Sequence, residues 1–378
     1  MKIIVFGLSI SSAWGNGHAT LLRGLFRALH EEGHEVHFFE LDTAYYAAHR
    51  DASSFDYVQL HLYRAWGEAL PAIRQLVTEA DVAMVTSYCP DGIAACEMVL
   101  SAKSGLRTVF YDMDTPVTLS RLAAGESVPY LPEAGLTEFD LVLSYTGGEA
   151  IGALRSKLGA KYAATLYGWV DPAVHFRVPA SPEFQAHLSY LGTYAADRQK
   201  ALNDLLITPA TNLKERSFVI AGAMYEDAGK WPANIRHFDH IAPPQHSAFY
   251  SSSNLTLSVT RAAMAAMGYC PSGRLFEAAA CGTAVLSDWW EGLDTFFQPN
   301  EEILIANSTN DAVAALNAGE AMLSRIGSRA RERAMDCHTA AVRARRLVEL
   351  IEAPSIALGE SWPADATEST PEFASREA

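Results

Sequence analysis

The stretch Pro271–Ser287, PSGRLFEAAACGTAVLS, contains the strongest indication of a fold in this chain. Residues Leu275–Cys281 have helical apolar spacing, and Ser272 stands where a side chain can cap the helix. Gly282 ends the predicted helix, and the apolar run Ala284–Ser287 predicts a short buried strand. The first turn of a helix has free backbone N–H groups, which attract phosphate. The stretch therefore predicts an anion site where a helix begins.

Strand and helix patterns alternate on both sides of this stretch. Predicted strands lie at 3–7, 35–41, 57–62, 81–87, 108–112, 140–145, 188–192, 217–221, 235–238, 255–259 and 302–306. The last two helical patterns cover 310–325 and 327–351. This alternation predicts the α/β class, with two doubly wound Rossmann-like domains that face each other across a cleft.

Length and composition restrict the organisation and the class of protein. A chain of 378 residues fits two domains, predicted at 1–175 and 183–335, and the polar segment 353–378 predicts a disordered tail. A net charge of −15 argues against non-specific binding to nucleic acid. Five cysteines without CxxC spacing, no signal-peptide pattern and no long apolar run predict a cytoplasmic protein without a membrane span.

Three arginines of the second domain follow predicted strand ends: Arg198, Arg261 and Arg274. Gly192 and Thr193 begin the loop that leads to the first of them. Three cations at one sheet edge can neutralise a diphosphate, although each alone is more often a surface ion-pair partner.

The helix of the opening stretch adds further candidates for nucleotide binding. Ser272 and Gly273 begin it, and Glu277 lies one turn in, where a carboxylate can accept hydrogen bonds from a ribose. We expect His240, in a loop after a predicted strand, near the base or the ribose. The spacing of His237, His240 and His246 is not typical of metal ligands, so we expect no metal there.

The loop Ser9–His18 follows the first strand but lacks the GxGxxG spacing of a dinucleotide site. A loop that closes over an acceptor is the favoured interpretation, with Trp14, Gly15, Asn16 and Gly17 on it. His18 begins the next helix. It is either a base that faces the cleft or a helix residue bonded to backbone.

The DxD pair Asp112 and Asp114 ends the fifth predicted strand. Two carboxylates at this spacing suit a hard cation, whereas a turn in which Asp114 caps a helix is the alternative. One functional acid, Asp114, is favoured over a metal site.

The segments LGTYAADRQ, LSVTR and PSGRLFEAAACGT resemble the C-terminal domain of glycosyltransferases with the GT-B fold, closest to the CgeB-like group within the group 1 class. SSAWGNGHAT and YDMDTP extend the resemblance over about residues 1–350. Glu277 matches the second Glu of the family motif, which contacts the ribose, whereas Tyr269 stands in the place of the first.

The resemblance implies an enzyme that transfers a sugar from a nucleotide-diphosphate donor to an acceptor without a metal or other cofactor. It implies that the second domain binds the donor through Arg198, that Asp114 and His18 are the catalytic candidates of the acceptor-side domain, and that a helix at 336–352 crosses back to that domain. The acceptor is not identified. A sugar-nucleotide epimerase or hydrolase, or a non-catalytic binding protein, remains an alternative on the same architecture.

Overall fold

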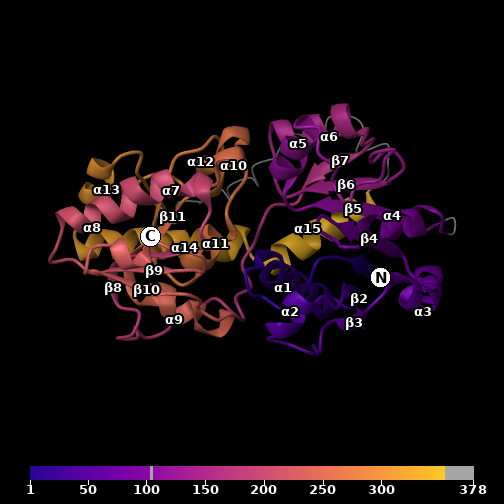
Figure 1. Cartoon of the computed structure of the whole chain (residues 1–378), viewed down its shortest axis with the longest axis horizontal. Helices are drawn as coiled ribbons and strands as arrows, with labels where there is room; N and C mark the ends of the chain where they lie inside the picture. The colour runs from indigo at the N-terminus through magenta and orange to yellow at the C-terminus, as the bar shows by residue number, and fades with distance from the viewer. Residues whose placement is uncertain (103–104, 354–378) are drawn as a thin grey trace, which may run out of the picture.

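The computed structural model describes residues 1–102 and 105–353, which form two α/β domains, each built on a parallel sheet (Figure 1). The predicted fold class is confirmed, because strands and helices alternate in both domains. The predicted tail 353–378 lies outside the described residues, apart from Ala353.

The first domain contains a parallel sheet of seven strands within the described residues. These are β1 (Lys2–Phe6), β2 (Glu35–Leu41), β3 (Gln59–Tyr63), β4 (Val82–Thr86), β5 (Arg107–Asp112), β6 (Leu141–Ser144) and β7 (Ala163–Thr165). Their order is β3-β2-β1-β4-β5-β6-β7, so the winding direction reverses between β1 and β4. Ligands of such sheets bind at the carboxyl strand ends near this reversal.

Helices cover both faces of the first sheet, which explains why its central strands are continuous apolar runs. They are α1 (Gly17–Glu31), α2 (Ala44–Ala48), α3 (Trp66–Glu79), α4 (Gly92–Leu100), α5 (Thr115–Ala123) and α6 (Glu149–Leu158). Ile3 and Val5 of β1 pack on the α1 side, whereas Ile4 and Phe6 pack on the side of α3 and α4.

The second domain repeats the design with strands in the order β10-β9-β8-β11-β12-β13. The strands are β8 (Ala186–Leu191), β9 (Phe218–Ala221), β10 (Ile235–Phe238), β11 (Ser253–Ser258), β12 (Ala284–Ser287) and β13 (Leu304–Ile305). The helices are α7 (Ala196–Leu202), α8 (Thr208–Asn212), α9 (His246–Ser251), α10 (Ala262–Met267), α11 (Gly273–Ala280), α12 (Leu293–Phe296), α13 (Thr309–Leu316) and α14 (Glu320–Cys337). A π-helical turn, Asn203–Ile207, joins α7 to α8.

The predicted helices 310–325 and 327–351 are wrong in their boundaries, because the segment forms three helices. Gly327 lies inside α14, where an added Cβ would stand 2.3 Å from the carbonyl oxygen of Gly282. This glycine therefore permits close packing rather than a helix end. The real breaks are at Gly319, before α14, and at Thr339, whose Oγ1 accepts the N–H of Val342 and caps α15 (Ala340–Glu352).

The last helix, α15, returns to the first domain and packs beside α1 in the same core (Figure 1). Leu347 and Leu350 of α15 are 1% exposed. The returning chain also pairs with the connection between the domains, because Val170 N–H donates to His338 O and Ala340 N–H donates to Val170 O. None of the described helices combines the length and apolar character that crossing a membrane needs.

Candidate functional site

The loop after β8 brings two arginines together at the carboxyl edge of the second sheet. Arg198, in α7, donates from Nη2 to the carbonyl oxygen of Thr193 at 2.6 Å. A Cβ at Gly192 would stand 3.1 Å from Nη2 of Arg274, so the missing side chain lets this second guanidinium pass. Arg274 lies over the ring of Tyr190, with Cζ 5.4 Å from the ring centroid.

The two guanidinium groups retain unused hydrogen-bond donors. Nε of Arg198 and Nη1 of Arg274 are buried and have no hydrogen-bond partner among the described residues. Burial and the neighbouring Arg274 charge lower the pKa of Arg198. Two buried like charges with unpaired donors are unfavourable alone. A polyanion that accepts from both would relieve this cost, so the pair is suited to a diphosphate.

An open pocket of about 610 Å³ adjoins the arginine pair, and Arg198 and Arg261 both line it. Arg261 is half-exposed and forms an ion pair with Asp197, with 3.3 Å between Nε and Oδ2. At the same sheet edge, the Oγ of Ser258 at the end of β11 is buried without a partner among the described residues. The pocket is therefore lined by two cations, and an unpaired hydroxyl lies at the same sheet edge.

Helix α11 begins one residue before Arg274. Ser272 occupies the N-cap position, but its side chain accepts no hydrogen bond from the helix, so the predicted side-chain cap is wrong. Gly273 is the first helical residue, and an added Cβ there would meet only Oε1 of Glu277, at 3.7 Å. An uncapped helix start leaves N–H groups available to an anion.

In the first domain, the predicted catalytic pair lies together. Nε2 of His18 is 3.2 Å from Oδ2 of Asp114, and Nδ1 of His18 is buried without a partner among the described residues. Asp114 occupies the N-cap position of α5 but makes no side-chain cap, so the capping alternative does not hold. The imidazole therefore has one nitrogen bonded to a carboxylate and the other free.

Asp112 has a different environment from Asp114. It is fully buried, and its Oδ1 accepts the backbone N–H of Asp114 and the hydroxyl of Thr118. Burial raises the pKa of Asp112 to about 6. Since Asp114 bonds to His18, the two carboxylates of the DxD pair are engaged by different groups.

Glu40, near the end of β2, holds the loop 9–17 in place through hydrogen bonds. Glu40 is fully buried and accepts from Ser9 Oγ at 2.8 Å and from the N–H groups of Ile10 and Ser11. Asn16 donates from Nδ2 to the carbonyls of Ser9 and Ser12. The buried carboxylate of Glu40 therefore stabilises the conformation of this loop.

The tip of this loop contacts the second domain. Trp14 stacks on His49, with ring centroids 4.5 Å apart, and lies 4.2 Å from the ring of His240. Gly15 has a φ of +60° in the turn before Gly17, where α1 begins. His240 is thus placed at the boundary between the domains, against the predicted acceptor loop.

The two half-sites meet across that boundary. Arg261 directly precedes α10, Asp114 directly precedes α5, and α10 contacts α5. Burial and Asp114 raise the pKa of Tyr88 to about 12, and Arg261 opposes this shift. The ring of Tyr269 lies between the domains, and a Cβ on Gly148 would stand 2.7 Å from its Cδ2.

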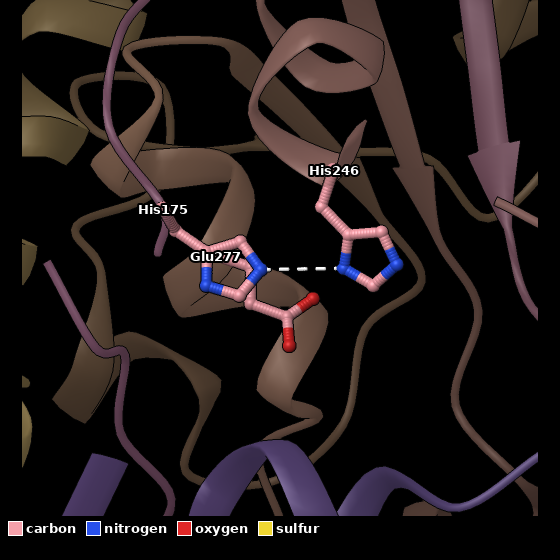
Figure 2. Close-up of side chains that lie close together, drawn as sticks. All are labelled: His175, His246 and Glu277. Atoms are coloured by element: carbon pink, nitrogen blue, oxygen red, sulfur yellow. Dashed lines mark hydrogen bonds between the residues drawn. The ribbon is translucent and has the colours of Figure 1, made fainter. Parts of the chain in front are cut away.

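A third group, which the sequence did not predict, lies behind the start of α11. Figure 2 shows His175, His246 and Glu277 facing one another, with candidate ligand atoms all within 4.8 Å. Glu277, for which a ribose contact stays a prediction, accepts the hydroxyl of Tyr250 at 3.1 Å and faces the two imidazoles. His175 comes from the connection between the domains, and its position in the sequence contains no signal of this contact.

Burial favours the neutral form of both histidines of this group. Burial lowers the pKa of His246 to about 4 and also lowers the pKa of His175. His246 donates from Nε2 to the carbonyl oxygen of Ile241 at 3.1 Å, which leaves its Nδ1 as a lone pair.

Comparisons with known proteins agree with this architecture. Residues 198–349 match a family model described as "Glycosyl transferase-like". No curated protein matches the sequence of this chain. The likeness to the CgeB-like group stays a prediction.

Solved structures resemble the whole chain. Sucrose-phosphate synthase from Thermosynechococcus elongatus is 14% identical, with a TM-score of 0.65 over 93% of this chain and 98% of its own. An alpha-glucosyltransferase in complex with UDP-glucose and DNA is 14% identical, with a TM-score of 0.66 over 93% and 100%. HepE from Anabaena, in complex with UDP and glucose, is 12% identical, with a TM-score of 0.64 over 94% and 100%. At these identities the likeness shows the fold, and the chain has the two Rossmann-like domains of the GT-B class.

Proposed function

We propose that this protein is a glycosyltransferase that moves a sugar from a nucleoside-diphosphate-sugar donor to an acceptor bound between the domains. The observation that carries the proposal is the pair of partly buried arginines, Arg198 and Arg274, whose buried, unpaired donors lie at the strand ends near the start of α11. The match of residues 198–349 to a glycosyltransferase-like family supports it.

The arginines would act on the leaving group. As the bond between the sugar C1 and the phosphate oxygen breaks, its electron pair passes to the diphosphate, whose growing charge both guanidinium groups stabilise. Three protein cations, Arg198, Arg261 and Arg274, supply the charge that a metal provides elsewhere, so we propose a metal-independent transfer. UDP is the first nucleotide to test, because two of the similar structures contain it.

His18 would act on the acceptor. With Asp114 bonded to Nε2, the proton of a neutral imidazole resides there and Nδ1 has a free lone pair. This nitrogen can take the proton of the acceptor hydroxyl as the oxygen attacks C1. Trp14 and His240 would form a wall on the acceptor side of the site. Five free cysteines suit a reducing compartment such as the cytoplasm.

The test is a binding and product measurement on the full chain. UDP-, TDP-, GDP- and ADP-sugars are screened by thermal shift, and the donor raises the melting temperature most. Arg274→Met should abolish the shift, whereas Arg329→Met, which removes an exposed arginine paired with Glu301, should keep it. No shift with any nucleotide would refute the donor site. Conversion of the donor to another sugar nucleotide would favour an epimerase.

A further inference from the structure

The cluster of His175, His246 and Glu277 has the chemistry of a transition-metal site that the donor chemistry does not use. It joins three separate segments: the connection between the domains, the first residue of α9, and the second turn of α11. Two imidazoles and one carboxylate form the ligand set of many three-residue zinc sites, with a fourth position open. Among the described residues, the cluster is the one group of at least three potential metal ligands that lie close together.

The spacing of the two histidines fits one shared ion. Nε2 of His175 and Nδ1 of His246 are 3.3 Å apart. Two nitrogens each bound about 2.1 Å from a tetrahedral zinc lie roughly 3.4 Å apart. Figure 2 shows the Glu277 carboxylate beside this pair, and one of its oxygens lies within 4.8 Å of both nitrogens.

The surroundings of the cluster are those of metal ligands. His246 donates its other ring N–H to Ile241 O, which fixes the tautomer that presents Nδ1 to the centre. Tyr250 donates its hydroxyl to Glu277 Oε2, which orients the carboxylate. Both contacts match the outer-shell pattern of protein zinc sites, in which a carbonyl holds the histidine and a donor holds the acid.

The cluster is largely buried but still reachable. His175 is 1% exposed, and the contact of its Nε2 with His246 is the one hydrogen bond that its ring makes within the described residues. His246 and Glu277 are partly buried, which leaves an entry path. We propose that His175, His246 and Glu277 bind one Zn²⁺ ion, which ties the connection between the domains to α9 and α11.

The test is metal content and metal affinity, measured on the untagged full chain without nucleotide. The chain is stripped with dipicolinate and titrated with Zn²⁺ by calorimetry, and Co²⁺ substitution is followed by its visible d–d absorption. We expect one Zn²⁺ per chain and tetrahedral Co²⁺ bands. His246→Ala and Glu277→Gln should each raise the Zn²⁺ dissociation constant at least 100-fold.

The matched control is His187→Gln, which removes a partly buried histidine of β8 that bonds to Ser217 instead of to this cluster. It should still bind one Zn²⁺ with the wild-type affinity. If the wild type binds no Zn²⁺ at micromolar concentration, the cluster is a hydrogen-bonded histidine pair beside an acid and the proposal is wrong. Unchanged affinity in His246→Ala would also overturn it. Because no nucleotide is present, either failure leaves the proposed transferase activity untouched.

Discussion

Nε2 of His18 lies 3.2 Å from Oδ2 of Asp114, although 96 positions separate the two residues in the sequence. The contact exists because both follow the carboxyl ends of strands in one parallel sheet, His18 through the loop after β1 and Asp114 directly after β5. The same edge faces α10, which begins one residue after Arg261 of the second domain. The proposed base and the proposed donor-binding cations therefore adjoin one boundary.

If His18 and Asp114 act as one unit, their substitutions should not add. His18→Ala and Asp114→Asn should each lower kcat by roughly 10²- to 10⁴-fold, because the base or the group that holds its tautomer is lost. The double variant should lose little more than His18→Ala alone. Steady-state kinetics with the donor found by thermal shift measure this.

The control for this cycle is nucleotide affinity. Both single variants should bind the nucleoside diphosphate within about threefold of the wild type, since neither residue contacts the arginine pocket. Fully additive losses in kcat, or a variant with wild-type kcat, would show that the pair does not work as a base and its partner.

Arg198→Met should separate binding from stability. Removing one of two adjacent buried charges relieves repulsion and the burial of an unpaired donor, so the melting temperature without ligand should stay equal or rise. Nucleotide affinity should fall at least 10-fold, because a charge-assisted contact to phosphate is lost. Differential scanning fluorimetry with and without nucleotide reads both effects. A variant that is destabilised yet binds normally would assign Arg198 a purely structural role.

The sequence predicted the elements of this site better than their contacts. Strand β2 and strand β10 coincide with their predicted ranges, because both are short runs rich in apolar or β-branched residues between clear turn residues. Parallel topology then places Arg198, Arg261 and Arg274 at one edge by geometry alone.

The features that the sequence did not predict arise from contacts between segments that are far apart in the chain. The sequence predicts a helix that begins at Gly327, whereas the structure places this glycine inside α14, where its missing side chain admits the backbone of Gly282. Two histidines from distant segments lie against Glu277, and the sequence did not predict this contact. The local periodicity of a sequence does not indicate which distant side chains the fold brings into contact.

Tyr269, which stands where the family motif has its first Glu, fills the space between the domains. Its ring packs against Gly148, so Gly148→Ala should cost both backbone strain, because φ is +55°, and a clash with Tyr269. We expect a loss of about 2–4 kcal/mol in the free energy of unfolding. Gly125→Ala, with φ of +74° and nothing near its Cβ, should lose only about 1–2 kcal/mol.

A second background isolates the clash. In Tyr269→Ala protein, the additional cost of Gly148→Ala should shrink but stay above that of Gly125→Ala, because the ψ of −132° at Gly148 lies outside the left-handed helical region. Urea denaturation followed by tryptophan fluorescence measures both costs. If Gly148→Ala and Gly125→Ala cost the same in the wild-type background, the ring of Tyr269 does not restrict the domain boundary.

The buried carboxyl of Asp112 should make stability depend on pH. Its pKa rises from 3.8 to about 6 in the folded chain, so folding favours the protonated form, and this contribution is lost as pH rises from about 4 to about 6. Asp112→Asn keeps the Oδ1 acceptor for Asp114 and Thr118 and removes the charge. The variant should therefore gain up to roughly 3 kcal/mol relative to the wild type between pH 4 and pH 7.

The test uses only the change with pH in the stability of Asp112→Asn relative to the wild type. Any fixed cost of the new amide, whose NH₂ lacks a partner where Oδ2 lacked one, cancels when the two pH values are subtracted. Urea midpoints at pH 4.5 and pH 7.5 give the two differences, and Asp56→Asn, at an exposed carboxylate, reports the effect of net charge alone. A difference between Asp112→Asn and wild type that is the same at both pH values would mean that Asp112 stays ionised in the folded chain.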